Sequence, residues 1–108
     1  MSQERIKLVI VDDHRIMREG LRLLIDRQPD MQVVGEAGDA AGALQCALRC
    51  SPDLVVMDLH LPDESGVEAA RKIFRERPAT TVVMLSSQLD PFYVQAALRA
   101  GELAIAAI

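Results

Sequence analysis

The 108-residue sequence predicts an α/β fold built around a doubly wound, parallel five-stranded sheet, with the chain order (βα)4β. Short aliphatic runs alternate with longer stretches in which apolar residues recur at helical spacing. The connections are short, and no linker, repeat or low-complexity segment interrupts them. Alternating units of this kind form parallel sheets with helices on both faces and right-handed crossovers, so a single domain is expected.

Five aliphatic runs are expected to form the strands. They are short and rich in Val, Ile and Leu, as strands buried on both faces of a sheet usually are. The expected strands are residues 6–11, 31–37, 54–57, 81–85 and 103–108.

Four helices are expected between the strands, and three of them begin with recognisable capping residues. Asp39 is the predicted N-cap of the second helix. Ser65, followed three residues later by Glu68, has the spacing of a capping box at the third. Asp90 and Pro91 are the expected N-cap and first-turn proline of the fourth. The expected helices are residues 16–28, 39–50, 65–77 and 90–100.

The first expected helix carries apolar residues at helical spacing, which predicts a buried stripe. Met17 belongs to this stripe and is expected, with Met57 of the third strand, to be among the most buried methionines. The stripe consists of Met17, Leu21, Leu24 and Ile25.

Charge, apolar runs and cysteine content exclude several classes of function. Twelve basic against 16 acidic residues give a net charge of −4, which argues against non-specific nucleic-acid binding by this segment. No apolar run resembles a signal peptide or could span a bilayer, so a cytoplasmic protein without membrane contact is expected. Cys46 and Cys50 have no nearby Cys or His to complete a metal site and are interpreted as ordinary thiols. Neither a Gly-x-Gly-x-x-Gly after the first strand nor a phosphate-binding Gly-Lys-Ser/Thr is present.

Polar residues follow three of the expected strands. Asp12 and Asp13 come after the first strand, Asp58 after the third, and Ser86 and Ser87 after the fourth. In a doubly wound sheet these strands can lie side by side, which would bring the polar side chains together at the edge where ligands bind. Three carboxylates at one point repel each other, and a hard cation such as Mg²⁺ relieves that repulsion. The pattern therefore predicts a Mg²⁺ site.

A carboxylate beside Mg²⁺, with a hydroxyl nearby, is a plausible nucleophile toward phosphorus. Asp58 could attack in line and form an aspartyl phosphate while the cation neutralises phosphoryl oxygens. From the local pattern alone, the alternative is that Asp58 only begins a turn.

Three separated segments resemble the receiver domain of two-component response regulators. They are "VDDH" (11–14), "MDLHLP" with Gly66 (57–66) and "VVMLSS" (82–87), and the likeness extends from Ile6 to Gly101. The resemblance implies the flavodoxin-like receiver fold. Two further segments, "VVGEAGD" (33–39) and "YVQAALRAG" (93–101), are most similar to the subfamily with a C-terminal helix-turn-helix DNA-binding domain.

The resemblance implies a role for each matching residue. Asp58 would be phosphorylated by a partner histidine kinase. Asp13 would bind Mg²⁺ directly, together with Asp58 and the backbone carbonyl of His60, while Asp12 would act through water. The Ser86 hydroxyl would hydrogen-bond the phosphoryl group and signal its presence. Such a domain is a phosphoacceptor that assists its own phosphorylation and dephosphorylation rather than an enzyme.

Other residues near the expected site allow different interpretations. His14 and His60 flank the carboxylates and could suggest Zn²⁺ or Fe²⁺, but the resemblance implies that their side chains point away from the metal. Arg15, Arg18 and Arg22 share one face of the first helix, which is either a solvated stripe or a docking surface for the kinase.

The end of the sequence departs from the family. Related receivers carry an aromatic residue and a Lys at the positions of Ile105 and Ile108. We therefore expect residues 1–108 to be a receiver truncated at or before the end of the fifth strand and lacking the final helix. Such a chain would bind Mg²⁺, switch poorly and self-associate through the uncovered surface. The alternative is a fragment of an ordinary receiver.

The sequence is compatible with three classes of function. The first is a phosphoacceptor switch. In this case transcription and DNA binding would depend on an output domain that is not present here. The second is a pseudo-receiver, an interaction module that no longer switches. The third is a Mg²⁺-dependent phosphatase with an aspartyl-phosphate intermediate, which is disfavoured because such enzymes commonly use Asp-x-Asp and a substrate-covering cap.

Overall fold

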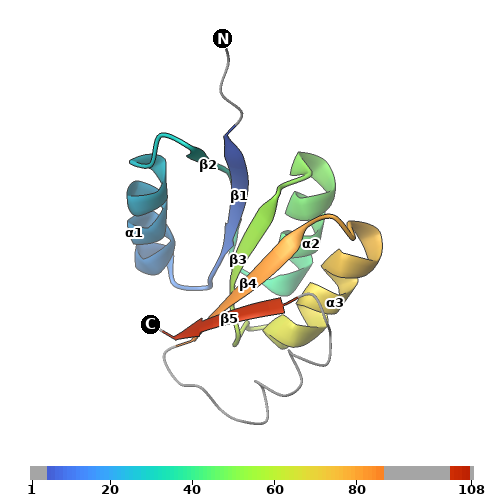
Figure 1. Ribbon diagram of the computed structural model, residues 1–108. Coiled ribbons are helices and arrows are strands. Elements are labelled where there is room, and N and C mark those ends of the chain that lie inside the picture. Colours follow the sequence, from blue (N-terminus) through green and yellow to red (C-terminus); the bar gives the residue numbers. More distant parts are fainter. Residues whose placement is uncertain (1–4, 87–102, 108) are drawn as a thin grey trace.

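The structure is a computed structural model that describes residues 5–86 and 103–107 (Figure 1). Its strands and helices alternate as the sequence predicts, and the expected helix over 90–100 lies outside the described residues. The helices are α1 (Arg15–Asp26), α2 (Ala40–Cys50) and α3 (Gly66–Glu76). The strands are β1 (Ile6–Val11), β2 (Met31–Ala37), β3 (Leu54–Asp58), β4 (Thr81–Ser86) and β5 (Leu103–Ala107).

The five strands form one parallel sheet with the order β2-β1-β3-β4-β5, which confirms the predicted fold class. Helix α1 lies on one face of the sheet, and α2 and α3 lie on the other (Figure 1). The chain order reverses at β1, because β2 lies on one side of it and β3 on the other. This topological switch point is where open α/β sheets bind ligands, at the carboxyl ends of the strands.

The core lies between the sheet and the helix pair α2 and α3. Val9, Val55 and Met57 from the central strands are fully buried there, together with Ala43 and Ile73 from the two helices. The alanines of α2 leave room for the helix to pack closely on the sheet. The central strands are therefore held in fixed positions by their neighbours in the sheet and by this core.

Two of the predicted caps are confirmed. The Asp39 side chain accepts a hydrogen bond from the backbone N–H of Gly42 at 2.7 Å, and Ser65 Oγ accepts one from Glu68 N–H at 3.2 Å. The predicted capping box is only half formed, because the Glu68 carboxylate pairs with Arg71 at 2.8 Å.

Helix α1 differs from the prediction, because none of its residues is buried. Met17 is 41% exposed and Leu24 is 61% exposed, so the expectation for Met17 is wrong, whereas Met57 is fully buried. Leu21 and Ile25 are half-buried. Helical periodicity identifies residues that share a face, but the burial of that face depends on what packs against it. No helix in the described ranges is both long and apolar enough to cross a membrane.

The two cysteines fill a gap between α2 and the edge strand β2. Their Sγ atoms lie 3.9 Å apart as free thiols, and Cys50 Sγ lies 3.6 Å from the carbonyl oxygen of Val34. The pairing of β1 with β2 shifts register at this point. The Cys46 sulfur occupies the space that a Cβ atom at Gly35 would need. Burial raises the pKa of the Cys46 thiol. The cysteines pack as apolar residues, in agreement with the sequence-based interpretation.

We predict that Gly35→Ala destabilises the protein by about 1–3 kcal/mol, because the new Cβ would overlap the Cys46 sulfur. Chemical denaturation with urea measures the effect. Adding Cys46→Ala removes the overlapping atom and should recover most of the loss. Gly20→Ala is the control, since nothing lies within 4 Å of a Cβ at that helical position; it should be neutral or stabilising by up to about 1 kcal/mol. Equal losses at the two glycines would contradict the packing argument.

Candidate functional site

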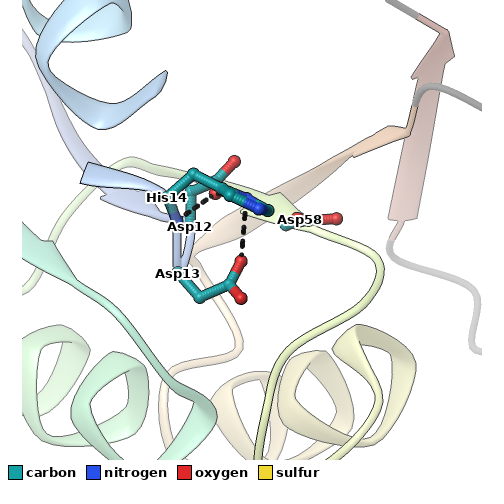
Figure 2. A group of neighbouring side chains, drawn as sticks. All are labelled: Asp12, Asp13, His14 and Asp58. Atoms are coloured by element: carbon teal, nitrogen blue, oxygen red, sulfur yellow. Dashed lines mark hydrogen bonds and ion pairs between the residues drawn. The ribbon is translucent and has the colours of Figure 1, made fainter. Parts of the chain in front are cut away.

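The carboxyl ends of β1 and β3 bring three carboxylates and one imidazole together (Figure 2). One potential ligand atom from each of Asp12, Asp13, His14 and Asp58 lies within 4.8 Å of all the others. The convergence of the carboxylates is the arrangement that the strand-end pattern predicts. It follows from the strand order, in which β1 and β3 are direct neighbours.

Asp12 is held in place by several hydrogen bonds. It is 8% exposed, and its Oδ1 accepts a hydrogen bond from the His14 backbone N–H at 2.8 Å. Its own N–H donates to the Ala37 carbonyl at 3.1 Å, and Arg18 Nη1 of α1 donates to its carbonyl at 2.6 Å. Asp13 has a more accessible side chain, 37% exposed. The two adjacent carboxylates therefore differ: Asp12 is engaged by the protein, and Asp13 is more open to a ligand.

The His14 ring lies against the carboxylates, and this corrects the expectation that it points away from them. Its Nδ1 is 3.1 Å from Asp12 Oδ1 and 3.0 Å from Asp13 Oδ1. The hydrogen bond with Asp12, followed by the charge of Asp13, raises the pKa of His14 above its usual value. A protonated His14 would offset part of the negative charge of the group.

Asp58 is the last residue of β3, and the loop that follows shapes its surroundings. Its Oδ1 accepts a hydrogen bond from the backbone N–H of His60 at 3.0 Å. In the adjacent strand β4, Leu85 pairs with Asp58 and Ser86 is the final residue. The backbone of Ser86 is thus at the same edge, whereas its hydroxyl is not among the described atoms.

Gly66 allows the loop to close tightly on the end of β3. Its N–H donates to the Leu59 carbonyl at 2.8 Å. A Cβ at this position would lie 2.6 Å from the Asp58 carbonyl oxygen and 3.0 Å from Leu59 Cα. Because both neighbours are backbone atoms, a side chain could be accommodated only by moving the backbone of Gly66 or the strand end that carries Asp58. This is a physical reason for a glycine at the matching position of the resemblance.

The arginines of α1 are paired within the chain. Arg18 and Arg22 both contact Glu36 of β2, and Arg15 pairs with Glu19 at 3.0 Å. Arg18 and Arg22 thus attach α1 to the edge strand β2, whereas the Arg15 pair lies within α1. The exposed side chains of Arg15 and Arg22 agree with a solvated stripe, whereas that of Arg18 is only 21% exposed. Docking of this face to the kinase stays a prediction.

One residue near the site is missing from the sequence-based interpretation. Asp63, in the loop between β3 and α3, accepts hydrogen bonds from the backbone N–H groups of Ala40 and Ala41 at 2.8 and 3.0 Å. These bonds, led by the one from Ala40, lower the pKa of the Asp63 carboxyl. No local pattern identifies this contact, because the partners are more than 20 positions apart in sequence.

The donor set fits a hard divalent cation. Carboxylate oxygens from three residues approach one another, with the loop backbone at His60 beside them. Oxygen donors of this type suit Mg²⁺, and its charge would relieve the repulsion among the carboxylates. Within the part of the chain that the structure describes, this is the only group of three or more potential metal ligands.

The sequence matches the response regulator receiver domain over residues 8–105. It is 42% identical over 96 residues to the uncharacterized transcriptional regulatory protein YhcZ of Bacillus subtilis (strain 168), covering 89% of this chain and 45% of that protein. It is 36% identical over 98 residues to the transcriptional regulatory protein LiaR of the same organism, covering 91% and 46%.

The structure is also similar to solved receivers. A crystal structure of a two-component response regulator of the LuxR family from Aurantimonas sp. SI85-9A1 matches with a TM-score of 0.90 and 36% identity, covering 96% of this chain and 74% of that chain. The chain spans about half the length of the curated relatives it matches.

Proposed function

Because this chain belongs to the response regulator receiver domain family, we propose that it accepts a phosphoryl group on Asp58 from a histidine kinase, with Mg²⁺. Receivers of transcriptional response regulators are signalling domains rather than enzymes in the usual sense. The observation that carries the proposal is the convergence of Asp12, Asp13 and Asp58 at the ends of two adjacent strands. We propose that the exchange takes place in the cytoplasm, as expected from the sequence.

In the proposed site, Asp13, Asp58 and the backbone carbonyl of His60 would hold the cation directly, and Asp12 would act through water. The accessible side chain of Asp13 supports its direct role, and the engaged Oδ1 of Asp12 supports the indirect one. When bound, Mg²⁺ would neutralise charge on the phosphoryl oxygens.

Asp58 is the proposed nucleophile. The His60 N–H holds Oδ1, so we assign the attack on phosphorus to Oδ2. A bond from this oxygen to phosphorus forms as the bond from phosphorus to the kinase's histidine nitrogen breaks. The Ser86 hydroxyl then donates a hydrogen bond to a phosphoryl oxygen and reports its presence.

The signal would reach DNA through an output domain. The curated relatives YhcZ and LiaR are named as transcriptional regulatory proteins, and this chain covers 45% and 46% of them. We propose that phosphorylation of Asp58 controls transcription through a C-terminal domain outside these 108 residues. A second candidate, a non-switching pseudo-receiver, is favoured by Ile105, which occupies β5 where the resemblance places an aromatic residue.

We predict that acetyl phosphate with Mg²⁺ adds one phosphoryl group to the chain and that Asp58→Asn abolishes the addition. Intact-mass spectrometry measures it. The matched control is Asp53→Asn, because Asp53 precedes the same strand at its opposite end and binds the Lys7 N–H at 2.9 Å. Label that persists in Asp58→Asn would overturn the assignment. An unlabelled wild-type chain would support the pseudo-receiver, and multiple turnover would support a phosphatase.

We predict that Asp13→Asn weakens Mg²⁺ binding by about 100-fold and Asp12→Asn by about tenfold, as expected for a direct and a water-mediated contact. Isothermal titration calorimetry on the metal-free protein measures both. Asn at position 12 retains an oxygen that can accept the His14 N–H, so the fold of that variant should be preserved. The reverse order of affinities would contradict the proposed geometry.

We also propose that the 108-residue chain self-associates with a second copy through the surface that the final helix would cover, and we assign this surface to the exposed apolar side chains of α1. Three side chains on this helix are strongly exposed, which supports an apolar contact there: Ile16 at 85%, Leu23 at 67% and Leu24 at 61%.

Sedimentation should show a concentration-dependent dimer whose dissociation constant rises about tenfold or more in Leu24→Gln. Leu48→Gln, which changes an exposed leucine on α2, should leave it unchanged. A wild-type chain that remains monomeric at all concentrations would refute this proposal.

A further inference from the structure

We propose that Asp63 is a positioning residue that fixes the Asp58 site by tying the β3–α3 loop to the N-terminus of α2; this inference rests on the function proposed above. Both carboxylate oxygens of Asp63 are used. Oδ1 accepts the Ala40 N–H at 2.8 Å, and Oδ2 accepts the Ala41 N–H at 3.0 Å. Hydrogen bonds to an ionised acceptor are stronger than neutral ones, and a helix N-terminus favours a negative charge.

Two carboxylates divide the first N–H groups of α2 between them. Asp39, the residue before the helix, takes the Gly42 N–H, whereas Asp63 takes those of Ala40 and Ala41. Asp39 is a local cap within its own turn. Asp63 belongs to a different loop, so its bonds connect two segments that are distant in sequence. The two residues therefore provide similar capping, but only Asp63 connects it to the loop beyond Asp58.

The loop that carries Asp63 is short and attached on both sides. Glu64 pairs with Lys72 of α3 at 2.9 Å, and Gly66 N–H closes onto the Leu59 carbonyl at 2.8 Å. Because the loop is attached in this way, a shift in the position of Asp63 would also shift His60. The N–H of His60 holds Asp58, and its carbonyl is a proposed cation ligand.

The segment 37–41, which Asp63 contacts at Ala40 and Ala41, also contacts the opposite side of the site. The Ala37 carbonyl, at the end of β2, accepts the N–H of Asp12 at 3.1 Å. Residues 37–41 thus contact the chain beside Asp12 through Ala37, and the loop beyond Asp58 through Ala40 and Ala41. These contacts link the chain beside Asp12 to the loop beyond Asp58 and restrain the conformation of that loop. Asp63 supplies the connection on the β3 side.

The test compares Asp63→Ala with Asp39→Ala, a matched control that removes a carboxylate from the same helix end. Three measurements are made on each variant: the urea midpoint, the Mg²⁺ affinity by calorimetry, and amide hydrogen exchange of His60 and Gly66 in the metal-free protein. Both variants should show similar falls in urea midpoint, since each loses capping bonds. Only Asp63→Ala should weaken Mg²⁺ binding, by about tenfold, and accelerate exchange at His60 by about tenfold or more.

Asp63→Asn serves as an intermediate variant. Its single amide oxygen can accept one of the two N–H groups but carries no charge, so its Mg²⁺ affinity should fall between those of the wild type and Asp63→Ala. Asp63→Ala with unchanged His60 exchange, or equal effects in Asp39→Ala, would overturn the positioning role. Failure of the proposed function appears separately, as a wild-type chain that neither binds Mg²⁺ nor is labelled; the exchange comparison still decides whether Asp63 orders the loop.

Discussion

Repulsion among Asp12, Asp13 and Asp58 is the constraint on which the arrangement of the site depends. One oxygen from each lies within 4.8 Å of the others, and two unit charges at that separation repel by roughly 3.5 kcal/mol at an effective dielectric constant of about 20. Several groups offset this repulsion: the His60 N–H at Asp58, the His14 N–H at Asp12, and the His14 ring between Asp12 and Asp13. A bound cation would offset the remaining negative charge.

The scaffold can maintain this unfavourable grouping because the carboxylates are attached to the most constrained strands. Strands β1 and β3 are direct neighbours in the sheet, and Val9, Val11, Val55 and Met57 are buried in its core. Moving apart the backbone positions that carry Asp12 and Asp58 would require the central strands to separate, with loss of their shared hydrogen bonds and of core packing. The close approach of Gly66 to the Asp58 carbonyl restricts the loop in the same way.

Sequence reasoning succeeds where structure is determined locally and fails where it depends on distant partners. Asp39 and Ser65 were predictable N-caps because the groups they bond lie three residues away. The grouping of Asp12 with Asp58 was predictable because parallel strands all end at one edge. No comparable rule predicts the contact of Asp63 with α2 or the exposure of Met17 on α1. Both depend on which surfaces meet after the chain has folded.

The two faces of the sheet differ in a way that affects how the site is supported. On the face with α2 and α3, buried alanines and Ile73 pack directly on the strands. On the same face, Asp63 joins the loop before α3 to the N-terminus of α2. On the opposite face, α1 has no buried residue and is attached partly through Arg18 and Arg22 to Glu36. Arg18 also donates to the Asp12 carbonyl, so α1 reaches the site through a polar contact. The geometry around Asp58 therefore depends on the α2 and α3 face, while contacts made by α1 would reach the site through Asp12.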